Sequence, residues 1–230
     1  MEHRLVFVTG GTGYMGSRLL PALLARGHRV RALARPGSAR RLPPALEIVL
    51  GDALDASSFA ERVPPCDTFV QLVGVSHPSP TKHREFRSVD LAAALSGVEA
   101  ARGASVRHFV YVSVAQPAPV MKAYVAARRE GEQAVREAGF PSATILRPWY
   151  VVGPRHQWPR LLAPAYWVWE HVPSTRDTAR RLGLVTLSQM VGALVRAVEE
   201  PPCGVRVVEV SELRGQRAGE AETPGMGAYP

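Results

Sequence analysis

The segment TGGTGYMG, residues 9–16, follows directly after the apolar run LVFV at residues 5–8. Its glycines at 10, 13 and 16 have the spacing of a phosphate-binding turn between a strand and a helix. The first permits a tight turn, the second lets the backbone approach a pyrophosphate, and the third lets the helix pack closely. The free N–H groups of that helix then face the phosphates. An ordinary turn can also be rich in glycine, so the neighbouring sequence decides between the two.

The residues around this segment have the pattern of a β-α-β unit. LVFV contains the β-branched and aromatic side chains typical of strands, and leucines at 19, 20, 23 and 24 recur at helical spacing. Gly27 ends that helix, and residues 28–34 read as a second strand. The unit therefore spans the ~30 residues that a dinucleotide-binding turn requires. We predict dinucleotide contacts from Gly10, Thr12, Gly13, Tyr14, Met15 and Gly16.

Strands and helices continue to alternate along the chain, which indicates a parallel sheet with helices on both faces. Strands are predicted at 46–50, 68–75, 108–114, 144–146 and 205–210, and helices at 57–63, 84–103, 121–139 and 187–200. The fold class is therefore α/β, a doubly wound parallel sheet (Rossmann fold) with a small C-terminal appendage. We expect a dinucleotide-binding core over 1–155, a substrate or cover region over 156–213, and a disordered tail over 214–230.

The basic charge of the chain does not indicate a nucleic-acid partner. The formal net charge is +8, but 26 of the 28 basic residues are arginine and asparagine is absent, a skew typical of genome composition. Basic runs interleaved with the aromatic residues that stack on bases are also absent from the sequence. We therefore expect a small-molecule substrate and no nucleic acid.

Membrane, disulfide and metal sites are not predicted either. No stretch approaches the ~20 apolar residues of a membrane-spanning helix, and the N-terminus lacks the pattern of a signal peptide. The two cysteines, Cys66 and Cys203, lie far apart in the sequence, which suits a reducing cytoplasm. The histidines lack metal-ligand spacing. We expect a cytoplasmic monomer or homodimer without a metal.

The second strand ends in a way that favours NADP(H) over NAD(H). NAD sites usually place an acidic residue there to hold the ribose hydroxyl. Here no Asp or Glu occurs between Glu2 and Glu47, and Arg35 ends the strand, with two further arginines at 40 and 41. A guanidinium pairs well with a 2′-phosphate. Later strand ends supply further predicted cofactor contacts at Asp52, Ala53, Val73, Gly74 and Pro148, although Asp52 could instead cap a turn.

Several segments, taken in order, resemble the short-chain dehydrogenase/reductase superfamily. They are TGGTGYMG, GDALD at 51–55, VRHFVYVSV at 106–114, ARREGEQAVREAG at 127–139 and TILRPWYVVGP at 144–154. The resemblance is to the atypical and extended branches, which include NmrA-like and complex I accessory-subunit relatives. It implies an NAD(P)-binding Rossmann core.

The resemblance also implies a set of catalytic residues. Active members use a Tyr as general acid or base, a Lys four residues later that binds the ribose and lowers the pKa of the Tyr, and a Ser after the preceding strand. The matching positions are Ser113, Tyr124 and Arg128, so the motif reads YVAAR where the family has YxxxK. Arginine keeps the charge, but it is bulkier than lysine. Arg128 is also expected at the cofactor. An alternative is a Tyr124 that only packs near the site.

Aromatic residues cluster after residue 148. All four tryptophans lie within 149–169, and Trp149, Tyr150 and Trp158 are the predicted substrate-pocket residues. Such a cluster suits an apolar or aromatic substrate such as a quinone. It equally suits a dimer face, a membrane-surface patch or a small core covering the sheet edge.

Three functions remain in play. The first is an NADP(H)-dependent oxidoreductase acting on a small apolar carbonyl, alcohol or quinone. The second is a non-catalytic NAD(P)-binding redox sensor or an assembly or accessory protein, which the replacement of Lys by Arg favours. The third, a sugar-nucleotide epimerase or dehydratase, is disfavoured because the region after residue 150 is short.

Overall fold

Seven parallel strands form the central sheet of the computed structural model, in the order β3-β2-β1-β4-β5-β6-β9. The structure describes residues 3–76, 78–154 and 181–215. The strands are β1 (Leu5–Thr9), β2 (Arg29–Ala34), β3 (Glu47–Leu50), β4 (Thr68–Gln71), β5 (His108–Val112), β6 (Ser142–Arg147) and β9 (Gly204–Glu209). The order reverses between β1 and β4. The predicted α/β class and doubly wound parallel sheet are confirmed.

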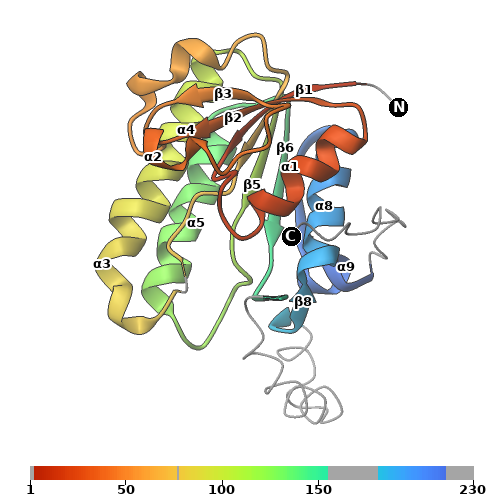
Figure 1. Ribbon diagram of the computed structural model, residues 1–230. Helices are drawn as coiled ribbons and strands as arrows, with labels where there is room; N and C mark the ends of the chain where they lie inside the picture. The colour runs from red at the N-terminus through yellow and green to blue at the C-terminus, as the bar shows by residue number, and fades with distance from the viewer. Residues whose placement is uncertain (1–2, 77, 155–180, 216–230) are drawn as a thin grey trace, which may run out of the picture.

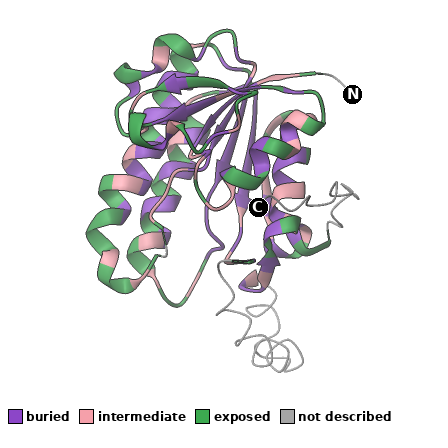
Figure 2. Cartoon of the chain, viewed as in Figure 1, coloured by how far each residue is buried: buried purple, intermediate pink, exposed green. Residues whose placement is uncertain are grey.

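Helices cover both faces of this sheet. Helices α1 (Gly16–Ala25), α8 (Leu187–Glu199) and α9 (Val210–Gly215) lie on one side, and α4 (Ala92–Gly103) and α5 (Lys122–Glu137) lie on the other (Figure 1). The short helix α2 (Pro36–Ala39) follows β2. The central strands β1, β4, β5 and β6 are almost wholly buried between these layers, while the outer faces of the helices are exposed (Figure 2). Each face therefore has its own hydrophobic core.

Stacked phenylalanines run across the middle of the sheet on the α4 and α5 side. Phe7, Phe69 and Phe109 are register partners on β1, β4 and β5, and successive ring centroids lie 5.2 Å apart. Each ring is fully buried. Phe59 and Phe140 extend the stack at its two ends. Because strands buried on both faces need apolar residues throughout, β4 and β5 form where the sequence has continuous apolar runs.

Three predicted elements differ in detail. The helix expected at 57–63 is two 3-10 turns, η1 (Ala56–Ser58) and η2 (Ala60–Arg62), because Asp55 caps the first and prolines follow. The helix expected at 84–103 is divided into α3 (His83–Glu85), a π-helical turn η4 (Phe86–Leu91) and α4, and a 3-10 turn, η3 (Pro80–Lys82), precedes it. The strand expected at 68–75 ends at Gln71, and the chain beyond it forms the rim of the sheet.

The described C-terminal part is joined to the core through both the sheet and a helix. Strand β9 pairs in parallel with β6, and α8 packs with α1 in the same hydrophobic core. These elements complete the sheet. The strands β7 (Tyr150–Val152) and β8 (Leu184–Thr186) pair with each other in a small second sheet. Residues 155–180 and 216–230, which include part of the expected cover region and most of the expected tail, lie outside the described residues.

Candidate functional site

The glycine segment forms a tight turn between β1 and α1. Gly10 has a φ of +73°, and the Gly13 N–H donates to the Gly10 carbonyl oxygen at 3.0 Å. A Cβ on Gly16 would overlap that oxygen and lie 2.6 Å from Gly11 Cα, so α1 can pack against the turn only when residue 16 has no side chain. Gly13, by contrast, is exposed. The turn thus combines a closely packed helix with backbone that faces solvent.

The first turn of α1 is suited to an anion. The preceding residue, Met15, makes no side-chain cap, and the turn contains no acidic residue. The positive end of the helix dipole is therefore not offset by a carboxylate within that turn. Thr12 and Tyr14 are partly buried, and the Tyr14 hydroxyl lies against Gly153, just after β7. The turn is therefore in contact with the small second sheet.

Exposed arginines follow β2. Arg35 precedes α2, and Arg40 and Arg41 follow it. Within the described part of the chain, no acidic side chain forms an ion pair with any of the three. Their charges are available to an anion next to the glycine turn.

The remaining strand ends lie at the same rim. Asp52 Oδ1 accepts a hydrogen bond from the Leu54 N–H at 3.0 Å, so one carboxylate oxygen caps the turn that also contains Ala53. After β4, the Val73 nitrogen would lie 3.0 Å from a Cβ on Gly10. The loop after β4 and the glycine turn are therefore in contact where the strand order reverses, the place where such sheets bind ligands.

Arg128 on α5 is buried against the loop after β4. Its Nη1 donates to the Val112 carbonyl oxygen at 2.8 Å, and its Nη2 lies 2.6 Å from Asp90 Oδ1. The Arg128 side chain is 6% exposed and that of Asp90 is 0% exposed. A Cβ on Gly74 would overlap Nη2, so the guanidinium occupies space that exists because residue 74 is glycine.

Tyr124 lies one helical turn before Arg128. Its ring packs on Phe86, with centroids 5.0 Å apart, and Arg128 Cζ lies 5.4 Å from its centroid. Burial raises the pKa of Tyr124 above its ordinary value of 10.0, and the opposing effect of the Arg128 charge is smaller. The cation thus acts in the expected direction, but the net shift is upward.

Ser113 is buried and faces α5. Its Oγ donates to Glu132 Oε1 at 2.5 Å, and Gln116 Nε2 donates to the same oxygen at 2.7 Å. Arg147 donates to both Glu132 oxygens, at 2.9 and 2.5 Å, and also to Glu209 at 2.8 Å. These bonds raise the pKa of Arg147, the bond with Glu132 having the largest effect. The buried Glu132 carboxylate therefore bonds Ser113 just after β5 and Arg147 at the end of β6, and Arg147 in turn bonds Glu209 at the end of β9.

The aromatic residues are only partly described. Trp149 and Tyr150 are half-buried and make an edge-to-face contact with centroids 5.4 Å apart. Trp149 packs on the core that contains α1 and α8. Pro148 is buried, and its carbonyl oxygen accepts from the Ala115 N–H at 2.9 Å. Trp158 lies outside the described residues.

Sequence reasoning missed Asp90 and Glu132. Both are nearly inaccessible to solvent, although charged residues are rarely buried without a partner. The available signal was periodicity: Arg128 and Glu132 occupy the same helical face as the apolar residue Val135. Charged residues on an apolar helical face predict buried ion pairs, but the sequence does not name their partners.

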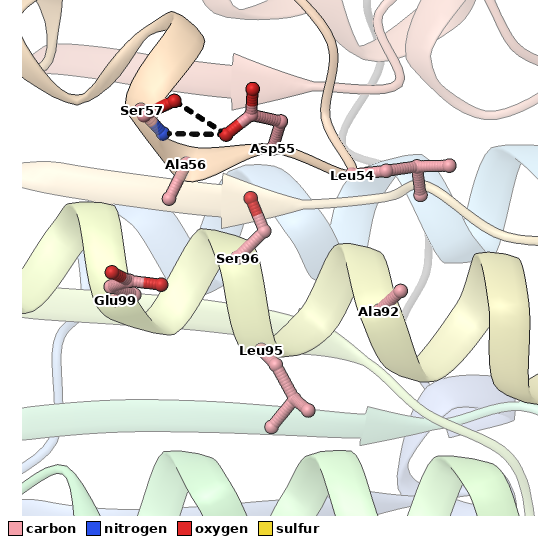
Figure 3. Close-up of a pocket in the computed structure, with 8 residues that line it drawn as sticks. All are labelled: Leu54, Asp55, Ala56, Ser57, Ala92, Leu95, Ser96 and Glu99. Carbon is pink, nitrogen blue, oxygen red and sulfur yellow. Dashed lines mark hydrogen bonds between the residues drawn. The ribbon is translucent and has the colours of Figure 1, made fainter.

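A shallow groove lies elsewhere on the surface, between η1 and α4 (Figure 3). Its lining residues are Leu54, Asp55, Ala56, Ser57, Ala92, Leu95, Ser96 and Glu99, none of them a predicted site residue. Among the described residues, no cluster of three His, Cys, Asp or Glu side chains could hold a metal ion. Within those residues there is also no helix of the length and apolar character needed to span a membrane.

Comparison with known proteins gives several named relatives. The chain is 33% identical over 152 residues to the ceramide reductase of Caulobacter vibrioides, covering 65% of this chain and 47% of that protein. It is 31% identical over 171 residues to the 4-hydroxy-2-methyl-3-oxo-4-farnesyl-3,4-dihydroquinoline-1-oxide ketoreductase of Stigmatella aurantiaca, covering 66% and 50%. It is 31% identical over 111 residues to the photosystem II assembly factor Ycf39 of Trieres chinensis, covering 47% and 34%. The chain thus spans half or less of the length of these relatives.

Solved structures share the fold. The Bordetella bronchiseptica enzyme WbmH in complex with NAD+ matches with a TM-score of 0.68 at 21% identity, covering 92% of this chain and 79% of that one. The Thermus thermophilus UDP-glucose 4-epimerase complex with NAD matches with a TM-score of 0.65 at 19% identity, covering 91% and 80%. The family model described as NAD(P)H-binding matches residues 10–159, from the glycine turn to beyond β7. The chain therefore belongs to the NAD(P)H-binding family, and its resemblance to the short-chain dehydrogenases/reductases is confirmed.

Proposed function

We propose that this protein is an NADP(H)-dependent oxidoreductase that moves hydride between the nicotinamide and an apolar carbonyl, alcohol or quinone. The observation that carries the proposal is the position of Tyr124 and Arg128. They lie one turn apart on α5, and Arg128 packs against Gly74, in the loop that adjoins the glycine turn. A dinucleotide bound across the reversal of strand order extends from that turn toward the ends of β4 and β5.

The rim of the sheet fits such a cofactor. The uncapped first turn of α1 and the exposed backbone at Gly13 suit the pyrophosphate, and Arg35 suits a 2′-phosphate. Asp52 and Ala53 are proposed at the adenine, and Thr12, Tyr14 and Met15 at the phosphates and adjoining riboses. Val73, Gly74, Arg128 and Pro148 are proposed at the nicotinamide half. When bound, NADP(H) supplies or accepts the hydride.

The chain's own residues would transfer the proton and bind the reacting oxygen of the substrate. Tyr124 is proposed to exchange a proton with that oxygen, since a phenol can act as a general acid or base. Ser113 donates its hydroxyl proton to Glu132, so in this arrangement it can accept a hydrogen bond from the hydroxyl of an alcohol, whereas bonding a carbonyl oxygen would require that proton to turn away from Glu132. Arg128, fixed by Asp90 and the Val112 carbonyl, places a permanent charge beside the Tyr124 ring.

Relatives support an apolar substrate. Two of them are named as a ceramide reductase and as a ketoreductase of a farnesylated dihydroquinoline oxide, and both names denote large apolar molecules. Trp149 and Tyr150 are half-exposed at the rim, and together with Trp158 they are proposed to supply apolar surface to such a substrate.

Titration with NADPH and with NADH, followed by tryptophan fluorescence, tests the cofactor assignment. We expect NADPH to bind more tightly than NADH. Arg35→Ala should weaken NADPH binding about tenfold, equivalent to about 1.4 kcal/mol, and leave NADH binding nearly unchanged. The matched control is Arg107→Ala. Arg107 is exposed and directly precedes β5, so it lies at the N-terminal ends of the strands, away from the proposed cofactor site. Equal binding of both nucleotides by the unmodified protein would contradict the NADP(H) preference.

A second candidate is a non-catalytic NAD(P)-binding sensor or assembly factor. The match to the assembly factor Ycf39 favours it, and so does the raised pKa of Tyr124 beside an arginine already paired with Asp90. This candidate predicts NADPH binding without NADPH oxidation by any ketone or quinone. If this candidate is right, Tyr124→Phe would leave NADPH binding unchanged and would remove only the titration signal of this tyrosine.

A further inference from the structure

Two residues of the π-helical turn η4 contact two equally spaced residues of helix α5. Phe86 and Asp90 are four apart on η4, and Tyr124 and Arg128 are four apart on α5. Phe86 packs on the Tyr124 ring at 5.0 Å, and Asp90 Oδ1 lies 2.6 Å from Arg128 Nη2. Each member of the proposed catalytic pair therefore has its own partner from the same turn.

Asp90 connects three segments at this point. Its Oδ1 pairs with Arg128 on α5, and its Oδ2 accepts from the Val75 N–H at 3.1 Å in the loop after β4. The residue is fully buried and belongs to the π-helical turn, a local widening that is frequent at functional sites. Removing this carboxylate would free Arg128 from η4 and leave the loop at Gly74 without one of its anchors.

Asp90 also changes the charge that Tyr124 experiences. The charged and titratable groups facing Tyr124 are Arg128 on its own helix, Asp90 on η4 and Tyr111 on β5. An unpaired cation beside a phenol favours the phenolate. Here the carboxylate at 2.6 Å offsets the guanidinium, so the pair as a whole is neutral. Burial then favours the neutral phenol.

We propose that Asp90 and Phe86 are positioning residues: Asp90 holds Arg128 against Gly74 and offsets its charge, and Phe86 holds the Tyr124 ring. Tyr124 then enters the reaction as a protonated phenol. When bound, NADPH would supply a hydride to the carbonyl carbon, while Tyr124 would give its proton to the carbonyl oxygen and the tyrosinate would regain a proton from water. This inference rests on the proposed function and adds the residues that position its catalytic pair.

The test is the titration of Tyr124, which needs neither cofactor nor substrate. Tyrosinate formation is followed by ultraviolet difference absorbance, and a Tyr124→Phe variant identifies the signal of this residue. Asp90→Asn keeps the shape of the side chain and removes its charge, so the Tyr124 midpoint should fall to lower pH. Glu130→Gln is the matched control, because it breaks an exposed ion pair with Arg87 between the same two elements. It should leave the midpoint unchanged.

Two further variants keep the proposal testable if Asp90→Asn does not fold. Asp90→Asn combined with Arg128→Met removes both charges, so the Tyr124 midpoint should stay near that of the unmodified protein. Phe86→Leu keeps the charges and loosens the packing of the ring, so the midpoint should fall as water reaches the phenol. A midpoint that stays fixed in both Asp90→Asn and Phe86→Leu overturns the proposal, as does a rise in either.

The result separates this inference from the proposed function. A shifted midpoint without NADPH binding supports the positioning roles and contradicts the oxidoreductase. NADPH-dependent ketone reduction with an unmoved midpoint supports the oxidoreductase and contradicts the positioning roles. If both hold, the pH profile of kcat/KM in Asp90→Asn should move in the same direction as the Tyr124 midpoint.

Discussion

The two halves of the rim are built in different ways. On the β1 and β2 side, the glycine turn offers backbone, empty space and exposed arginines. On the β4 to β6 side, buried charges on α5 are matched by opposite charges from other elements. The first half is prepared for a ligand that brings its own negative charge, while the second is already neutralised internally. Under the proposed binding mode, electrostatic attraction would act at the phosphate end of the cofactor, whereas the nicotinamide end would depend on precise placement.

Removing Arg128 should break the second half most severely. Arg128→Met leaves the buried Asp90 carboxylate without its partner, and the loss of a single member of such a pair costs about 3–5 kcal/mol of unfolding free energy. Denaturant unfolding measures this loss. Arg87→Met removes an exposed arginine from the same interface and should have little effect. An equal loss of unfolding free energy in both variants would show that the buried Arg128–Asp90 pair contributes no more to stability than the exposed Arg87–Glu130 pair.

Acidification should lower the free energy of unfolding through His108, which lies at the N-terminal ends of the strands and away from both halves of the rim. His108 is buried between the Ser142 hydroxyl and the Ala197 carbonyl, and burial lowers its pKa from 6.5 to about 4. The fold therefore favours neutral imidazole. Its contribution is complete above pH 6.5 and is lost as the pH falls toward 4, to a total of about 3 kcal/mol.

Unfolding free energies at several pH values test this expectation. In His108→Gln the decline between pH 6.5 and 4 should become shallower than in the unmodified protein. His83→Gln, an exposed histidine, is the control. If His108→Gln keeps the full pH dependence, the buried neutral imidazole is not the source of the acid sensitivity.

A smaller effect is expected from filling the glycine turn. Gly16→Ala places a methyl group against the backbone of Gly10 and Gly11, which cannot rotate away. Overpacking of this kind costs about 1–3 kcal/mol, and NADPH binding should weaken with it. Gly103→Ala meets no atom within 4 Å and should change stability by less than about 0.5 kcal/mol. Equal NADPH binding by both variants would contradict the phosphate role of the turn.

Sequence reasoning predicted the fold class and the turn because both depend on short-range patterns. The spacing of glycines and the alternation of apolar strands with amphipathic helices lie within single segments. It predicted less well where a local preference competes with packing. Residues 84–103 have a continuous helical pattern, yet Phe86 and Asp90 meet α5 through a π-helical turn inside it. In place of the helix predicted at 57–63 the chain forms two 3-10 turns, because hydroxyl and carboxylate side chains there bind the backbone.

The sequence by itself determined the parallel α/β sheet, the turn at Gly10 to Gly16 and the arginine at the end of β2. Only the tertiary structure decided that Arg128 pairs with Asp90 and that β9 completes the sheet. It also decided that Glu132 accepts hydrogen bonds from both Ser113 and Arg147. The physical reason is that backbone geometry and hydrophobic periodicity are properties of neighbouring residues. The partner of a buried charge depends instead on how helices far apart in the sequence lie across the sheet.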